Sequence, residues 1–284
     1  MSRKVTAGIA ALAMMLAGGA ARAEAQAATG NAAPIRVLVI TATQGFRHTE
    51  SINASLEVLK ALEPKGEFSF QFSNDVSPIN AQSLAHFDVL FLNNATLRAA
   101  PANPADTAAV REHRTARVPD ALTIEQQKAM VDFVRSGKGL ASVHSGVDAN
   151  YGWPEYREMV GGGLFKGHPW TQPAKINVED KANPAVSHFG DSFQIRDEMY
   201  VLDANPRATS HVILSLDMPS VGEPAGSQDH PTAFIRRYGQ GRVFVTLLGH
   251  FGDNWQRQDF VQHVLQGLRI AAGRVPADFT PGNK

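Results

Sequence analysis

The chain of 284 residues contains no cysteine, and this absence excludes several structures and chemistries. The protein has no disulfide bond, no thiol that could act as a nucleophile, and no site for a lipoprotein anchor. The chain also has no excess of charge, because 27 lysines and arginines balance 27 aspartates and glutamates. Without a basic stripe it does not resemble a nucleic-acid-binding protein, so we expect its partner to be a small molecule of low charge.

Long apolar runs are absent as well, except near the N-terminus. Ser2–Lys4 is basic, Val5–Gly19 is apolar and small, and Ala21–Ala23 has the small-x-small pattern of a cleavage site. The apolar run is too short and too rich in alanine and glycine for a transmembrane helix. We therefore predict that residues 1–27 are a signal peptide and a loose tail. The mature protein is then periplasmic or secreted, with no membrane contact after cleavage.

Residues 34–275 fit a single α/β domain, because short apolar segments alternate with helical periodicity. The sheet is expected to be mostly parallel, with an antiparallel excursion in its second half. Residues 98–120, rich in alanine, proline and arginine, are expected to form a loop insertion. The expected strands are Ile35–Ala42, Phe68–Phe72, Asp88–Leu92, Leu140–Val143, Ala174–Val178, Ser192–Ile195, His211–Leu216, Thr232–Tyr238 and Arg242–Leu248.

Helices are indicated by their caps and their apolar spacing. Thr123 and Gln126 have the spacing of a capping box, and Gly137 is placed to end the helix that follows. The side chains expected to face the core from this helix are Ile124, Met130, Phe133 and Val134. Further helices are expected at Ile52–Leu62, Tyr151–Val160 and Phe260–Ala272.

The end of one expected strand carries an unusual residue. Leu140–Val143 is typical of a buried parallel strand, and it stops at His144. Ser142–Gly146 has the outline of a nucleophile elbow, but with an imidazole at its centre. Imidazole binds metals and transfers protons, and it is a poor durable nucleophile. His144 is therefore a candidate for chemistry, and the alternative is a buried turn residue that is hydrogen-bonded to the backbone.

Histidines recur at the ends of expected strands. His48 follows the first strand, His144 ends a central one, and His250 follows the last. Because the carboxyl ends of parallel strands share one edge of a sheet, we expect these three rings to meet there. His168 and Glu198 come from the intervening segment and are placed to fold over the same edge. A single histidine at a strand end is more often a loop anchor, but three at equivalent positions favour a site.

Five motifs occur in the order found in a known family. They are Gly45-Phe46-Arg47-His48, Val143-His144-Ser145, Gly161–Phe165 with His168-Pro169, Asp197–Tyr200, and Gly239–Phe244 with Gly249-His250. From Ile35 to Gly273 the chain resembles the trehalose-utilisation (ThuA-like) family. The resemblance implies the fold of class I glutamine amidotransferases, a flavodoxin-like three-layer α/β sandwich. It places His144 about where an amidotransferase carries its nucleophilic cysteine, so glutaminase activity is not expected.

The resemblance also implies a role in carbohydrate metabolism, on trehalose-like disaccharides or their 3-keto derivatives. We expect an enzyme that uses acid–base chemistry. The expected catalytic residues are His48, His144, Glu198 and His250. The residues expected to bind the sugar are Arg47, Asn94, Ser145, His168, Tyr200 and Trp255. Family members often carry an acidic residue directly after the first of these histidines, whereas this chain has Thr49 and then Glu50.

Two alternatives remain open. One is a divalent-metal-dependent sugar hydrolase or isomerase, in which His48, His144, His250 or Glu198 binds a metal such as zinc. The other is a non-catalytic periplasmic module that binds a sugar. No cofactor is required by the sequence, and the pattern indicates no particular oligomeric state.

Overall fold

Five strands run parallel in the half of the sheet that carries the histidine loops. The computed structural model describes residues 33–101 and 121–283, and all nine strands found there belong to one sheet. The parallel strands are β2 (Phe68–Ser73), β1 (Ile35–Ile40), β3 (Val89–Asn93), β4 (Gly139–Val143) and β9 (Gly241–Thr246), in this spatial order. The loops that follow these strands therefore lie along one edge of the sheet.

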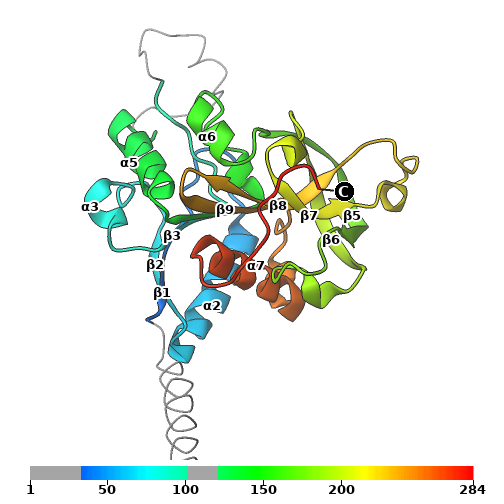
Figure 1. Ribbon diagram of the computed structural model, residues 1–284, viewed down its shortest axis with the longest axis horizontal. Helices are drawn as coiled ribbons and strands as arrows, with labels where there is room; N and C mark the ends of the chain where they lie inside the picture. Colours follow the sequence, from blue (N-terminus) through cyan, green and yellow to red (C-terminus); the bar gives the residue numbers. More distant parts are fainter. Residues whose placement is uncertain (1–32, 102–120, 284) are drawn as a thin grey trace, which may run out of the picture. The chain divides into compact units, whose positions relative to one another are not determined.

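The other half of the sheet is antiparallel. From β9 the order continues through β8 (Pro231–Tyr238), β7 (His211–Leu216) and β5 (Phe165–Val178) to the edge strand β6 (Ser192–Leu202). Figure 1 shows β5, β6 and β7 on one side of β8 and β9, with β1, β2 and β3 on the other. The complete order is β2-β1-β3-β4-β9-β8-β7-β5-β6, a mixed α/β sheet.

Helices lie on both faces of this sheet. The longer helices in the described ranges are α2 (Thr49–Leu62), α5 (Ile124–Arg135) and α7 (Gln258–Ala271), and the shorter ones are α3 (Ala81–Leu84) and α6 (Pro154–Met159). Short 3₁₀ turns connect the elements: η1 (Glu63–Lys65), η3 (His144–Val147), η4 (Ser187–Phe189), η5 (Pro206–Ala208), η6 (Met218–Val221) and η7 (Gly252–Gln256).

The core is divided by the sheet into two apolar clusters. Consecutive side chains of a strand point to opposite faces, so Val37 of β1 belongs to one cluster and Leu38 to the other. The first cluster contains side chains from α2 and α7, such as Val264, and the second contains side chains from α5 and α6, such as Met130. Each fully buried aliphatic side chain contributes about 1.5–3 kcal/mol to folding. Both faces are thus covered, with α2 and α7 below the sheet and α5 and α6 above it in Figure 1.

The start of α5 confirms the predicted capping box. The Thr123 hydroxyl accepts a hydrogen bond from the Gln126 backbone N–H, and the Gln126 side chain accepts one from the Thr123 backbone N–H. The prediction that Ile124 is buried was wrong, because 46% of this residue is exposed. It is the first residue of the helix and lies ahead of the buried stripe, in which Gln127 donates hydrogen bonds to the carbonyls of Ala100 and Leu122.

Two predicted strands are longer than their apolar patterns indicated. β5 begins at Phe165 rather than Ala174, and β6 extends to Leu202 rather than Ile195. In these extensions, glycine, proline and charged residues interrupt the alternation of apolar and polar side chains. The extensions are still strands, because β5 and β6 pair with each other there in an antiparallel ladder that contains bulges. His168 and Glu198 therefore lie on paired strands, whereas the predicted strands began at Ala174 and ended at Ile195 and included neither residue.

Two expectations concern residues that the structure does not describe. The predicted signal peptide and tail at residues 1–27 lie outside the described residues, as does residue 102 onward of the predicted insertion at 98–120. Within the described ranges, none of the helices has the length and apolar character needed to cross a bilayer.

Candidate functional site

Four side chains meet at the carboxyl edge of the parallel strands. His48 lies between β1 and α2, His144 begins η3 after β4, His250 follows β9, and Glu198 lies on β6. One ligand atom from each of the four lies within 4.8 Å of the others. We call this group the histidine–glutamate cluster. The strand-end histidines expected to meet from the sequence are therefore together in the structure.

The three imidazole rings of the cluster face one another almost at right angles. The ring centroids of His48 and His144 are 4.8 Å apart, those of His48 and His250 are 5.0 Å apart, and those of His144 and His250 are 5.2 Å apart. The interplanar angles are 86°, 88° and 79°. In each pair the edge of one ring therefore meets the face of the other.

Glu198 reaches the cluster from the far edge of the sheet. In the strand order, β6 lies five places beyond β4, and yet Glu198 Oε2 is 3.4 Å from His144 Nε2 and 3.1 Å from His250 Nδ1. The antiparallel half must therefore curl back over the carboxyl edge of the parallel half. Side chains alternate along β6, so Tyr200 shares the face of Glu198, and its ring centroid lies 4.0 Å from that of His144.

A strained turn holds His144 in place. Its φ is +48°, in the left-handed region that a non-glycine residue rarely adopts. The side chain has no exposed surface, and its Nδ1–H donates a hydrogen bond to the Leu247 carbonyl at 2.8 Å. A Cβ on Gly146 would lie 2.2 Å from Ser142 Oγ, which explains the glycine two residues later. The bond to Leu247 sets the tautomer, so that Nε2 faces the cluster.

A bulge directs His168 toward the same carboxylate. On β5, Gly167 pairs with Val201 and Trp170 with Met199, so three steps on β5 match two on β6. The extra residue changes the direction of the side chain, and His168 Nδ1 lies 3.1 Å from Glu198 Oε1. The two oxygens of Glu198 therefore have separate partners: Oε1 faces His168, and Oε2 faces His144 and His250.

A second carboxylate, that of Asp197, connects two of the segments that carry the cluster. Asp197 is fully buried, and its oxygens accept hydrogen bonds from the backbone N–H groups of Glu198, Gly249 and His250 at 2.9, 2.6 and 3.0 Å. The side-chain amide of Asn254 donates a fourth, at 3.0 Å. Asp197 thus joins the strand that carries Glu198 to the loop that carries His250.

The environment shifts the pKa values of these groups in different directions. Burial, with the nearby rings of His144 and His250, lowers the pKa of His48 to about 3. Burial alone would raise the pKa of Glu198, but hydrogen bonds and charge from the His144 and His250 rings outweigh it and lower the pKa well below its usual value. Burial raises the pKa of Asp197, against the opposing effect of its hydrogen bonds. At neutral pH, His48 is therefore uncharged and Glu198 is ionised.

The cluster opens onto a cleft of about 380 Å³. The lining includes His48 and His250 of the cluster together with Phe46, Arg47, Thr49, Glu50 and Phe251. Phe46 is 68% exposed, and its ring meets that of His48 edge-on at 4.9 Å. Arg47 donates hydrogen bonds to the Thr41 carbonyl and the Thr43 hydroxyl at the cleft wall. An aromatic ring and a cation beside a cleft are typical of a small-molecule binding site.

Three of the predicted sugar-binding residues lie beneath the cluster rather than in the cleft. Trp255 is 1% exposed, packs against Phe260, and donates its indole N–H to the Ser51 hydroxyl at 3.0 Å. Asn94 is buried and donates hydrogen bonds to Ser51 and to the Gly249 carbonyl. Ser145 has no exposed surface. These three side chains are buried, and none of them lines this cleft.

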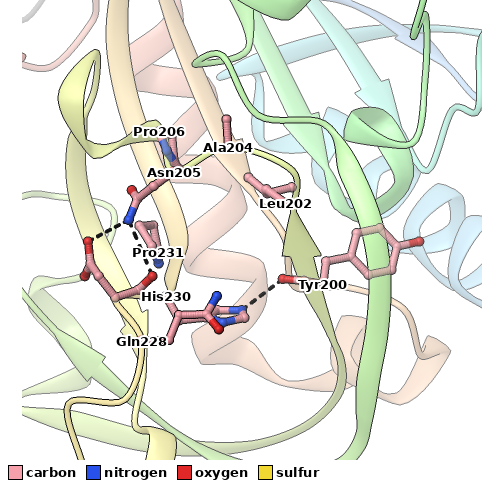
Figure 2. Close-up of a pocket in the computed structure, with 9 residues that line it drawn as sticks. Tyr200, Leu202, Ala204, Asn205, Pro206, Gln228, His230 and Pro231 are labelled. Atoms are coloured by element: carbon pink, nitrogen blue, oxygen red, sulfur yellow. Dashed lines mark hydrogen bonds between the residues drawn. The ribbon is translucent and has the colours of Figure 1, made fainter.

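A second, smaller pocket lies beside β6 but does not belong to the cluster. Asn205, Gln228, Asp229 and His230 are among its lining residues. Figure 2 shows the His230 ring at the backbone of Tyr200, to whose carbonyl its Nε2–H donates a hydrogen bond at 2.9 Å, while the Tyr200 ring points away from this group. The pocket shares only Tyr200 with the surroundings of the cluster, so it is not assigned a part in the site.

Two supporting features were not predicted from the sequence. The role of Asp197 as the link between β6 and the His250 loop could only have been suspected from its position next to Glu198. The Leu247 carbonyl, which orients His144, leaves no signal in the sequence, because every residue has such a group.

The sheet and the cluster define a class of protein: a mixed α/β fold with three histidines and a glutamate at the carboxyl ends of its parallel strands. The family model for ThuA, described as trehalose utilisation, matches residues 36–271. The chain therefore belongs to the ThuA family.

Solved structures agree with this assignment at the level of the fold. A ThuA-like protein from Bacteroides uniformis is similar with a TM-score of 0.66 and 19% identity, over 84% of this chain and 92% of that one. A ThuA-like protein from Parabacteroides merdae is similar with a TM-score of 0.64 and 19% identity, over 88% of this chain and 95% of that one. No curated protein matches the sequence.

Proposed function

We propose that this ThuA family member is an exported enzyme that converts a trehalose-like disaccharide or a keto-sugar by acid–base chemistry in the histidine–glutamate cluster. The observation that carries the proposal is the convergence of four ionisable side chains, from four separate segments, within 4.8 Å of one another. Ionisable groups that gather at the carboxyl edge of a parallel sheet, beside an open cleft, are typical of an active site.

Each group has a part in this proposal. Glu198, held as a carboxylate, orients the rings of His168 and His250 through its two oxygens. These two rings reach solvent, with exposed side-chain fractions of 48% and 20%, and they exchange protons with the sugar hydroxyl or carbonyl. His144 is fully enclosed and fixes the position of Glu198. The Tyr200 ring forms the wall beside His144.

The proposal includes a three-layer architecture for the domain and an exported location for the protein. Helices cover both faces of the sheet, as in the three-layer, amidotransferase-like sandwich. The positive φ at His144, directly after β4, matches the geometry of a nucleophile elbow. The basic, apolar and small-residue pattern of residues 1–23 supports export to the periplasm or the medium.

The test is a direct search for conversion. We expect that purified protein, incubated with trehalose, 3-keto-trehalose and common glycosides, changes at least one of them, as detected by NMR and mass spectrometry. Glu198→Gln should reduce the rate by about 10²–10⁴-fold, the usual contribution of one acid–base group. Saturable binding of a sugar that is recovered unchanged would instead identify a non-catalytic binding module and contradict the enzyme.

A further inference from the structure

We propose that the histidine–glutamate cluster binds one divalent transition-metal ion of the zinc class, with His48, His144, His250 and Glu198 as its ligands. Its catalytic role rests on the function proposed above, but its binding can be measured independently of any sugar. The argument depends on the spacing of the donor atoms, on their hydrogens, and on the charge enclosed with them.

The spacing of three donor atoms fits one ion, and the donor atom of His48 lies within 4.8 Å of each of them. His144 Nε2, His250 Nδ1 and Glu198 Oε2 are separated by 3.2, 3.4 and 3.1 Å. Ligands on a tetrahedral ion with bonds of 2.0–2.1 Å are about 3.3 Å apart. The same bond length places the centroids of three coordinating rings about 5 Å apart, and the observed separations are 4.8, 5.0 and 5.2 Å.

Hydrogen bonds alone do not account for this arrangement. The Nδ1–H of His144 is used by the Leu247 carbonyl, so Nε2 of the neutral ring carries a lone pair. That lone pair faces the lone pairs of Glu198 Oε2 at 3.4 Å. The single hydrogen on His250 Nδ1 can satisfy only one of these two atoms well. A cation must therefore lie among them, and it is either an additional proton or a metal ion.

The surrounding contacts favour a metal ion. A metal-binding histidine normally donates its other N–H to a carbonyl or carboxylate, as His144 does to Leu247. Glu198 is oriented in the same way, because His168 occupies Oε1 and leaves Oε2 directed at the three rings. His48 is buried, and its Nδ1 has no hydrogen-bond partner within the described part of the chain.

The enclosed charge also favours a divalent cation. Asp197 and Glu198 are adjacent and both buried. Within residues 33–101 and 121–283, neither forms an ion pair with a lysine or an arginine. Two carboxylates buried side by side without a lysine or arginine partner are costly unless other positive charge lies beside them. A divalent ion supplies that charge, and the cleft beside His48 and His250 gives water or a sugar oxygen access to a fifth position on the ion.

The first test measures the metal directly. The full chain, expressed with its own processing and purified without a polyhistidine tag, should contain close to one zinc-class ion per chain by elemental analysis. His144→Ala and Glu198→Gln should each contain at least ten-fold less metal per chain than the wild type. His86→Ala, which removes an exposed histidine outside the cluster, is the matched control and should keep it.

The second test does not depend on the folding of a variant. Wild-type protein stripped with chelator should rise in Tm by about 5–10 °C when zinc is added at 100 times its Kd. Added Co²⁺ should give the visible absorption of a low-coordinate cobalt site. If the purified protein contains almost no metal, and neither zinc nor Co²⁺ has these effects, the metal proposal is wrong.

The outcomes separate the two proposals. Sugar conversion by metal-free protein, unaffected by chelator, would overturn the metal site and leave the acid–base enzyme. One bound ion per chain with no conversion of any sugar tested would support the metal site and count against the proposed substrate class.

Discussion

The carboxylate of Asp197 accepts a hydrogen bond from the backbone N–H of His250, with 3.0 Å between Oδ1 and N. Asp197 lies on the last strand in the order of the sheet, and His250 follows a central one. This contact fixes the distance between Glu198 and the His250 ring through the backbone, so the geometry of the cluster depends on a residue that does not face it.

Replacement of Asp197 by Asn should loosen this connection. An amide has one oxygen in place of two, and its NH₂ group would face an N–H donor of Glu198, Gly249 or His250. We expect the free energy of unfolding to fall by about 2–3 kcal/mol, the cost of an unsatisfied buried polar group. Urea titration measures this loss. Asp191→Asn, at an exposed carboxylate paired with Lys181, is the control and should leave the midpoint unchanged.

Gly249→Ala should be more damaging than alanine at an ordinary turn glycine. The φ of Gly249 is +114°, and a Cβ there would lie 2.8 Å from Val143 Cγ1. Gly66 also has a positive φ, of +77°, in the left-handed region, but a Cβ there would meet nothing within 4 Å. We expect Gly66→Ala to cost about 1 kcal/mol from backbone strain alone, and Gly249→Ala roughly 3 kcal/mol or more. Equal losses of unfolding free energy would show that the contact with Val143 is unimportant.

His144→Ala and His144→Gly separate the function of this residue from its conformation. Both remove the imidazole and should abolish turnover. Because φ is +48° at this position, glycine avoids the strain that alanine retains, so His144→Gly should be more stable than His144→Ala by about 1 kcal/mol. The fold should survive in both, as shown by circular dichroism. A large loss of Tm with only a small loss of turnover would indicate that His144 is a structural residue.

The stability of the protein should fall in mild acid through His263. This ring is fully buried between α7 and η4, donates Nδ1–H to the Ala185 carbonyl, and has no partner at Nε2 in the described structure. Burial lowers its pKa from 6.5 to about 4. Between pH 6.5 and pH 4 the unfolded chain therefore binds more protons than the folded chain. The contribution of neutral His263 to the free energy of unfolding is fully present above pH 6.5 and is lost as the pH falls toward 4.

The size of this loss is at most about 3 kcal/mol for His263. The measurement is the difference in unfolding free energy between wild type and His263→Leu from pH 7.5 to pH 4. The free energy of unfolding of wild type should fall relative to that of His263→Leu as the pH falls, because only the wild type has a buried ring whose protonation favours the unfolded chain. A difference that stays constant over this range would contradict the assignment.

Phe46→Ala should affect the sugar and leave the fold unchanged. The ring is 68% exposed at the mouth of the cleft, so its removal should change the unfolding free energy by less than about 0.5 kcal/mol. If a sugar stacks on this face, KM should rise several-fold with kcat nearly constant. Ile124→Ala, at another exposed apolar residue outside the cleft, is the matched control and should change neither constant.

The parallel half of the fold and the meeting of His48, His144 and His250 could be predicted from the sequence. Apolar runs marked the strands, and parallel strands place their carboxyl ends on one edge. The extensions of β5 and β6 could not be predicted, because the bulges around His168 depend on pairing with a distant strand and not on hydrophobic periodicity. For the same reason the predicted strand ended at Ile195, three residues before Glu198.

The burial of the residues expected to bind the sugar could not be predicted from the sequence. Trp255 and Ser145 are close to His250 and His144 along the chain, and Asn94 follows the end of β3, but position in the sequence does not reveal on which side of the backbone a side chain lies. The indole of Trp255 packs in the core, whereas Phe46, which the motif contained but the pattern did not single out, is exposed at the cleft. Burial depends on the whole tertiary structure.

Because the sheet curls, the histidine–glutamate cluster is complete only when both halves of the sheet are in place. His48 and His250 are separated by most of the folded chain, and Glu198 joins them only when the final edge strand has docked. Contacts of such long sequence separation form late, because the loops that they close must first lose their entropy. The cluster therefore needs both halves of the sheet: the loops of the parallel half carry the three imidazoles, and the carboxylate opposite them comes from β6 at the antiparallel edge.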